Sequence, residues 1–296
     1  MSSYHTSSPS LSLECGATDI DGCVCVRAAP PRLGAAGGLQ NIWQLQAFAE
    51  NGGAPVGRYG HTLTLLDPSP EAGSAVLVLF GGNGAWDDLL GDLWKMHLND
   101  VTSSRWELIR PACPSEGCPV NRTQHAADVI DGKMYMFGGI TSGGALSDEL
   151  WVWDSGASSG ASSGAGSWQK ISAVDCINDP TGAVPPATTE HTFAAVGASR
   201  LVLFGGNQST GSNGGAVVTN ATWEFDTSTS CWTQLTPTMD KDKILLGRIG
   251  HSAVVFNSTD SSNGKEMHVM FGRGTELYPE DISWKLVISS SDAGLR

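Results

Sequence analysis

The chain has 296 residues, of which 40% are hydrophobic, enough to fill a core of ordinary size. Its formal net charge of −13, without a cluster of lysine and arginine, makes nucleic acid and anionic membrane surfaces poor partners. The longest aliphatic run, residues 75–80, is far shorter than the roughly 20 residues of a membrane-spanning helix, so we expect no membrane insertion.

Residues 1–40 match no repeat and are predicted to form an irregular, cysteine-containing segment. Their polar opening lacks the apolar stretch of a signal peptide. Residues 41–48, which contain Trp43, are predicted to form a lone strand of the type that ends each repeat described next.

From residue 57 onward, one pattern recurs four times. Each copy has a histidine, an apolar run that ends in glycine, and then a tryptophan, which three copies follow with a second tryptophan. The histidines fall 64, 66 and 60 residues apart, at His61, His125, His191 and His251. The paired glycines are Gly81, Gly82, Gly138, Gly139, Gly205 and Gly206. The tryptophans are Trp94, Trp106, Trp151, Trp168, Trp223, Trp232 and Trp284.

Each copy is predicted to form a sheet of four strands, a to d. Strand a follows the histidine, and strand b is apolar on both faces because sheets stack on both sides of it. The glycines end strand b where a side chain would obstruct a tight turn or the close approach of another backbone. Strands c and d carry the tryptophans, which pack between neighbouring sheets. Radial stacking of such sheets buries faces that one sheet cannot bury alone.

Paired glycines after an apolar strand, followed by one tryptophan and then another, resemble the kelch repeat over about residues 41–288. The resemblance implies an all-β fold, a kelch-type β-propeller of the galactose-oxidase-like superfamily, and most often protein–protein recognition. The expected blades span about residues 57–110, 121–172, 188–236 and 247–288, which leaves 289–296 as a tail. Two departures stand out: Arg273 replaces a glycine in the fourth copy, and Thr188 replaces an arginine in the third.

Two arrangements of the blades fit the repeat. A closed four-bladed ring would use strand 41–48 to complete the last sheet, whereas an arc of a six- or seven-bladed propeller, which we favour, would expose two apolar blade faces. The stretch from Asp154 to Ser167, rich in glycine, alanine and serine, is predicted to be a flexible loop of the second blade.

The repeated histidines invite comparison with a metal cluster, but metal ligands must converge, so we expect each histidine to hydrogen-bond a neighbouring turn. Arg58, Arg122 and Arg248 precede three of these histidines and are expected near the mouth of the central channel. There they either grip an acidic peptide or carboxylate, or pair with acidic residues of their own repeats.

The loops between strands b and c and between strands d and a are expected to share one face, where a partner would bind. Trp86 and Arg273 are the partner-binding candidates on these loops, and a tryptophan there is either tucked under its blade or exposed as an anchor. Other residues expected on this face are Asn83, Asp87, Asp88, Thr141, Asn207 and Glu276.

No catalytic residue, metal site or cofactor is predicted. Kelch-like propellers include a copper radical oxidase, whose metal needs tyrosines and histidines around it, but this chain has 4 tyrosines, two of them at repeat positions. Iron-dependent kelch proteins use evenly spaced Glu, Asp and His, a step that Asp88, Asp92 and His97 miss. We therefore expect a non-catalytic scaffold for a protein or peptide partner, and the arginines favour an acidic one. The alternative is a kelch-like enzyme acting on a sugar or small metabolite at the channel mouth, which a bound transition metal would favour.

Cysteines and glycosylation sequons bear on the compartment. Cys113 and Cys118 flank a short loop and could form a disulfide in an oxidising compartment, although the same spacing also suits reduced thiols. Sequons occur at Asn121, Asn207, Asn220 and Asn257. We favour an extracellular or cell-surface glycoprotein over a cytoplasmic protein.

Overall fold

The computed structural model describes residues 53–67, 75–98, 104–110, 117–156, 166–172, 183–211, 215–236, 245–257, 264–274 and 283–288. The chain divides into two compact units, Met1–Leu45 and Gln46–Arg296, and all of the described residues belong to the second. Strands dominate these residues, whose helical pieces are two single 3₁₀ turns, Ala85–Asp87 and Ser142–Gly144. None of the helices in this described part could span a membrane.

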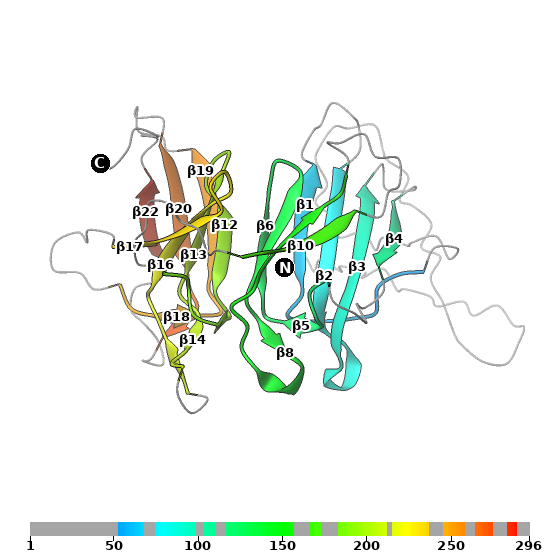
Figure 1. Cartoon of the computed structure of the whole chain (residues 1–296), viewed down its shortest axis with the longest axis horizontal. Coiled ribbons are helices and arrows are strands. Elements are labelled where there is room, and N and C mark those ends of the chain that lie inside the picture. The colour runs from blue at the N-terminus through cyan, green and yellow to red at the C-terminus, as the bar shows by residue number, and fades with distance from the viewer. Residues whose placement is uncertain are drawn as a thin grey trace, which may run out of the picture. The chain divides into compact units, whose positions relative to one another are not determined.

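Four antiparallel sheets, or blades, follow one another along the chain (Figure 1), and each pairs its strands in chain order. Blade 1 contains β1 (Thr62–Asp67), β2 (Ala75–Asn83), β3 (Leu89–Leu98) and β4 (Arg105–Arg110). Blade 2 contains β6 (Ala126–Ile130), β7 (Lys133–Phe137), β9 (Leu150–Asp154) and β10 (Ser167–Ile171). Blade 3 contains β12 (Thr192–Ala195), β13 (Arg200–Phe204), β16 (Thr222–Asp226) and β17 (Cys231–Leu235). Blade 4 contains β19 (Ser252–Asn257), β20 (Lys265–Met270) and β22 (Ser283–Ile288).

These sheets confirm the predicted all-β architecture and the four strand types of each complete repeat. Blade 4 has three described strands, and the strand expected at 41–48 lies outside the described residues, as do 1–40 and the tail 289–296. The predicted loop of blade 2 joins β9 to β10, and its residues 157–165 also lie outside the described part.

Short ladders join the residues before each strand a, which we call the lead-in of the blade, to the residues after strand b. The lead-ins are Arg58–Gly60, Arg122–Gln124, Thr188–Glu190 and Arg248–Gly250. The ladders of blades 2 to 4 pair β5 (Arg122–Thr123) with β8 (Ile140–Thr141), β11 (Thr188–Thr189) with β14 (Asn207–Ser209) and β15 (Ala216–Val218), and β18 (Arg248–Ile249) with β21 (Arg273–Gly274). A bridge between Tyr59 and Asn83 takes their place in blade 1. The ladders lie along one edge of the blades (Figure 1), and we call this edge the loop face.

The innermost strands contact one another in sequence: β1 with β6, β6 with β12, and β12 with β19. No comparable contact joins β19 to β1 in the described part of the chain. The described blades therefore form a row, and blade 4 does not contact blade 1 through these strands. The choice between a closed ring and an arc stays a prediction, because strand 41–48 lies outside the described residues.

Three hydrophobic clusters fill the spaces between consecutive blades. Trp153 and Trp168 of blade 2 pack against Phe80 of blade 1, and the fully buried Trp232 of blade 3 packs against Phe137 of blade 2. Met267 and Val269 of blade 4 pack against blade 3. Each tryptophan of the repeat that lies in these clusters is 9% exposed or less, as expected for side chains that wedge between sheets. Trp106 and Trp284 are half-buried.

The first glycine of each pair admits the lead-in of the next blade. Gly81 has φ of +64°, and a Cβ atom there would lie 2.7 Å from the carbonyl oxygen of Arg122. Gly205 is equivalent, since its Cβ would lie 2.8 Å from the carbonyl oxygen of Arg248. Both the positive φ and the approaching backbone therefore require glycine, as the sequence predicts.

The register of the fourth blade corrects one expectation. Met270 pairs with Ser252 just as Phe80 pairs with Thr62, so Phe271 stands at the position of Gly81 and Gly272 at that of the second glycine. The glycine of the repeat is therefore replaced by Phe271 and not by Arg273, which lies beyond the pair in β21.

Replacing Gly81 with alanine should destabilise the protein by about 2 kcal/mol or more, because the new Cβ meets the backbone of blade 2. The matched control is Gly143→Ala, which also has a positive φ but no atom within 4 Å of the added Cβ. Urea unfolding of both variants measures the difference, and equal losses would mean that the contact between blades is unimportant.

Candidate interaction site

Backbone hydrogen bonds link the lead-ins of adjacent blades. The residue before each repeated histidine has a positive φ, and in blades 2, 3 and 4 its N–H donates to the carbonyl of its counterpart in the preceding blade. The N···O distances are 2.7 Å from Gln124 to Gly60, 3.1 Å from Glu190 to Gln124, and 3.3 Å from Gly250 to Glu190. The loop face is therefore held together by main-chain bonds that run across the blades.

The lead-in arginines are buried and bonded within their own repeats. Arg58 binds Asp92 through two bonds of 2.6 and 2.9 Å, and Arg122 binds Glu149 at 2.7 Å. Each guanidinium also donates to the carbonyl of the first glycine position, at 3.0 Å to Gly81 and to Gly138. Arg248 does the same at 3.2 Å to Phe271.

These contacts agree with the within-repeat alternative for the arginines. Arg122 and Arg248 are 0% exposed, and the side chain of Arg58 is 3% exposed. The guanidinium groups do not converge on a surface that a partner could reach, so a ring of arginines that grips an acidic peptide is not what the structure contains.

Blade 3 has lost both members of this ion pair. Thr188 replaces the arginine, and Ala221 stands at the position of the carboxylates of Asp92 and Glu149. Thr188 is 0% exposed, and its hydroxyl donates to the carbonyl of Pro186 at 2.6 Å. Loss of the pair as a unit avoids a buried charge without a partner, which is costly.

The environment of Glu149 keeps its carboxylate ionised. Burial by itself would raise the pKa of this group, but hydrogen bonds from Lys170, Trp151 and Arg122 outweigh it and lower the pKa to about 2. The pair of Arg122 and Glu149 therefore remains charged through the whole range near neutrality.

The change Glu149→Ala should cost about 3 kcal/mol, because it leaves Arg122 buried without its carboxylate. The double variant Arg122→Thr/Glu149→Ala reproduces blade 3 and should cost less than Glu149→Ala alone. Lys133→Ala, which removes a half-exposed ion pair with Asp154, serves as the control and should cost less than about 1 kcal/mol. Additive losses in urea unfolding would contradict the proposed coupling.

Two of the repeated histidines bond strand a of the preceding blade, and not a turn as the sequence analysis expected. Nε2 of His125 lies 3.0 Å from the hydroxyl of Thr62, and Nε2 of His251 lies 3.0 Å from that of Thr192. Burial, joined by the charge of a nearby arginine, lowers the pKa of His251 to about 4 and that of His125 well below 6.5. Both imidazoles are therefore neutral near pH 7.

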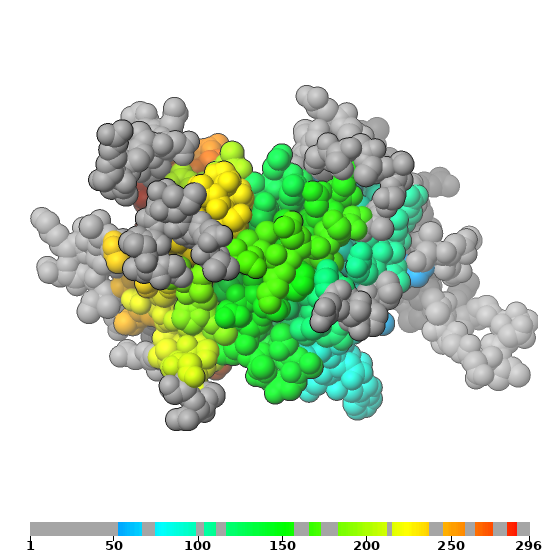
Figure 2. All heavy atoms as spheres, viewed as in Figure 1, coloured from blue at the N-terminus to red at the C-terminus, as the bar shows by residue number. Residues whose placement is uncertain are grey.

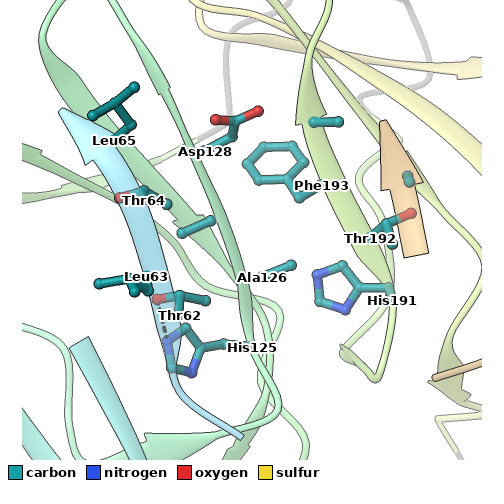
Figure 3. A pocket seen from close by; sticks show the side chains of 13 residues that line it. Thr62, Leu63, Thr64, Leu65, His125, Ala126, Asp128, His191, Thr192 and Phe193 are labelled. Carbon is teal, nitrogen blue, oxygen red and sulfur yellow. Dashed lines mark hydrogen bonds between the residues drawn. The ribbon is translucent and has the colours of Figure 1, made fainter. Parts of the chain in front are cut away.

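His191 lacks this bond because Ala126 stands where the other blades have a hydroxyl (Figure 3). Its Nε2 has no hydrogen-bond partner, and burial, with a contribution from His251, lowers the pKa of its imidazole to about 3. His191 lines a pocket of about 410 Å³ between the innermost strands, together with Thr64, Asp128 and Phe193. The carboxylate of Asp128 is held in place by accepting bonds from the N–H groups of Val129 and Ala195, both at 2.7 Å.

Ala126→Thr should stabilise the protein by about 1 kcal/mol, because the new hydroxyl gives Nε2 of His191 the partner that its counterparts have. Ala126→Val adds the same bulk without the hydroxyl and isolates the hydrogen bond. If both variants shift the urea midpoint equally, the unpaired nitrogen carries no cost.

Trp86 is the most exposed large apolar side chain among the described residues, with 96% of its surface accessible. It lies on the 3₁₀ turn between β2 and β3, which stands at the lower edge of the molecular surface (Figure 2). Trp86 and Asp87 both have positive φ, of 63° and 60°, which is unfavourable for residues with a side chain. Of the two alternatives for this tryptophan, the structure has the exposed one.

Hydrogen bonds fix the turn that carries Trp86. The hydroxyl of Tyr59 donates to Asp87 at 2.6 Å, and the side-chain amide of Asn83 donates to that hydroxyl at 3.0 Å. A backbone bond of 2.9 Å from Gly84 to Asp88 closes the loop. These bonds hold the turn without any contribution from burial of the indole, which therefore projects from an ordered turn into solvent.

Further apolar side chains accompany Trp86 on the loop face. Tyr59 is 54% exposed and Phe271 is 63% exposed, and Val56 and Val120 precede the lead-ins of blades 1 and 2 with 60% and 48% exposed. Arg273, the other candidate for partner binding, is exposed in β21, whereas Asn83, Thr141 and Asn207 are half-buried in the ladders. Glu276 lies outside the described residues.

Several residues of this site were not found from the sequence. Asp92 and Glu149 each precede a repeat tryptophan by two residues. Blade 3 lacks both the carboxylate at this position and the arginine, and this joint loss indicates an ion pair that the sequence analysis missed. Tyr59 and Asp87 carried no such signal, because their bond depends on the turn. Within the described part of the chain, no cluster of three or more His, Cys, Asp or Glu residues could hold a metal ion.

The positions that bear on the compartment have structural contacts. The side-chain amides of Asn121 and Asn220 donate to the carbonyls of Leu89 and Leu245, both at 2.8 Å. Asn257 is exposed at the end of β19. Cys118 is 6% exposed and disulfide-bonded, and Cys113 lies outside the described residues.

Four-stranded blades, paired glycines at each blade junction and tryptophan wedges define a β-propeller of the kelch type. The chain belongs to the kelch-repeat family: the KLHDC2/KLHL20/DRC7 Kelch-repeats domain matches residues 40–264. Proteins of this family typically act as protein-interaction scaffolds.

Curated relatives share the kelch region over part of their length. Adagio-like protein 3 of Oryza sativa subsp. japonica is 32% identical over 160 residues, which are 54% of this chain and 21% of that protein. Multiple epidermal growth factor-like domains protein 8 of Homo sapiens is 30% identical over 183 residues, 62% of this chain and 6% of that protein. An F-box/kelch-repeat protein of Arabidopsis thaliana is 27% identical over 209 residues, 69% and 39% of the two chains. The matched regions thus span at most 39% of these three relatives.

Proposed function

We propose that the chain is a non-catalytic scaffold that binds a protein or peptide partner on its loop face, with Trp86 as the anchor. The observation that carries the proposal is a 96% exposed tryptophan on a turn whose conformation is fixed by Tyr59, Asn83 and Asp88. Tryptophan and tyrosine dominate the binding energy of protein interfaces, and an ordered anchor loses little entropy when it binds.

The surroundings of Trp86 suit a partner held by apolar contacts. Tyr59 and Val56 of blade 1 expose more than half of their surface on the same face, and Phe271 does so in blade 4, at the other end of the row. The expectation of an acidic partner rested on accessible lead-in arginines, but all three side chains are buried, and those of Arg58 and Arg122 are held in ion pairs. We therefore extend the proposal to an apolar recognition segment and not to an acidic one.

Trp86→Ala should weaken partner binding by about 10- to 100-fold and leave the thermal midpoint unchanged, because the indole packs against nothing that the fold needs. The full chain, immobilised as wild type, Trp86→Ala and Leu108→Ala, is exposed to extract of the source cells, and bound proteins are quantified by mass spectrometry. Leu108 is 45% exposed on β4, away from the loop face, and controls for the loss of an apolar surface group.

Proteins captured by the wild type and by Leu108→Ala but depleted with Trp86→Ala would be loop-face partners, and titration against the purified partner would give the fold-change. Equal capture by all three forms would refute the role of Trp86.

A further inference from the structure

Blades 1, 2 and 3 each receive the next blade in the same way. The first glycine after strand b faces the lead-in of the next blade, whose carbonyl oxygen would be 2.7 Å from a Cβ at Gly81 and 2.8 Å from one at Gly205. At Gly138 the carbonyl of Thr188 comes closer still. The N–H of the following glycine then bonds that carbonyl, at 2.9 Å from Gly139 to Thr188 and from Gly206 to Arg248.

Blade 4 has a phenylalanine at this position. Phe271 takes the left-handed conformation of the glycines that it replaces, with φ of 60°, and its carbonyl accepts the same arginine bond. Its side chain begins where the lead-in backbone of a following blade would lie, and it is 63% exposed. A backbone carbonyl cannot retreat from a Cβ as the end of a flexible side chain can, so the block is a steric one.

The sheet face of blade 4 that points away from blade 3 is also unlike its counterparts. His268 occupies the position of the buried Val78, Tyr135 and Val202, since it pairs with Val254 as they pair with the same position of strand a. Exposed Ser283 occupies the position of Leu93, Leu150 and Thr222, all of which are buried.

Charged groups are bonded to one another on this face. His268 lies 3.2 Å from Glu266, which also binds Lys285 at 3.2 Å, and the ring of Phe256 stacks on His268 with centroids 4.6 Å apart. Val254 and Phe256 remain 45% and 42% exposed. A polar outer face is typical of the repeat that ends an array, because it faces water and not another repeat.

We propose that blade 4 is a terminal blade, whose outer face excludes any further kelch blade docked as blades 2, 3 and 4 are docked. The exclusion applies equally to an added blade, to blade 1 of the same chain and to blade 1 of a second copy, because each would bring a lead-in carbonyl to Phe271. A ring that contains this blade is therefore not closed by a standard contact between blades on that side. This inference is independent of the proposed binding role of Trp86.

The accessibility of position 271 tests the proposal directly. In the full chain, Phe271→Cys should react with a maleimide at least about tenfold faster than Val269→Cys, which is two residues away and 5% exposed in the wild type. Peptide mapping separates the new thiol from the 7 native cysteines. Equally slow labelling of both positions would show that a blade or another element covers Phe271, and would overturn the proposal.

A reciprocal exchange tests the steric block. Gly205→Phe should abolish folding or lower the thermal midpoint by more than about 10 °C, because blade 4 can no longer dock on blade 3, whereas Phe271→Gly should shift the midpoint by less than about 3 °C. A wild-type midpoint for Gly205→Phe, or a large fall for Phe271→Gly, would overturn the proposal. Neither result depends on partner capture, so the outcome is separable from that for Trp86.

Discussion

The fold depends on the close approach of one backbone to another at each junction between blades. The carbonyl oxygen of a lead-in lies no more than 2.8 Å from the point where a Cβ of the preceding blade's first glycine would be, and this contact sets the distance between the sheets. At that distance the repeated histidine reaches the threonine of the preceding blade, and tryptophans such as Trp232 fill the remaining space. The first glycine of each pair therefore serves mainly to dock the next blade, whereas the second lets the lead-in of its own blade approach.

The repeat allowed much of this architecture to be predicted from the sequence. Four copies with one spacing of histidine, glycine and tryptophan define the blades, and the strands lie where that spacing places them. The register of the fourth copy could not be predicted, because Phe271-Gly272-Arg273 contains one glycine and can be aligned in two ways. Only the pairing of Met270 with Ser252 decides between them.

The site was less accessible to prediction than the fold. Whether Trp86 is exposed depends on a turn that is stabilised by a hydrogen bond between Tyr59 and Asp87. The repeat pattern of the sequence does not predict this bond. The arginines of blades 1 and 2 illustrate the opposite case, since their carboxylate partners Asp92 and Glu149 stand at the same position, two residues before a repeat tryptophan. In blade 3, Thr188 and Ala221 replace the arginine and the carboxylate together, which indicates a structural ion pair. If the arginine instead bound a partner, its loss would give no reason for the carboxylate to be lost as well.

The linear order of the contacts has a consequence for how the protein opens. Each inner strand contacts its immediate neighbours, so within the described residues blade 1 and blade 4 are coupled only through the two blades between them. Local unfolding is then cheapest at an end of the row, and amide hydrogens of β19, β20 and β22 should exchange before those of β7 and β13. A ligand held at blade 1 would raise the cost of opening most strongly there, and its effect would fade from blade to blade along the row.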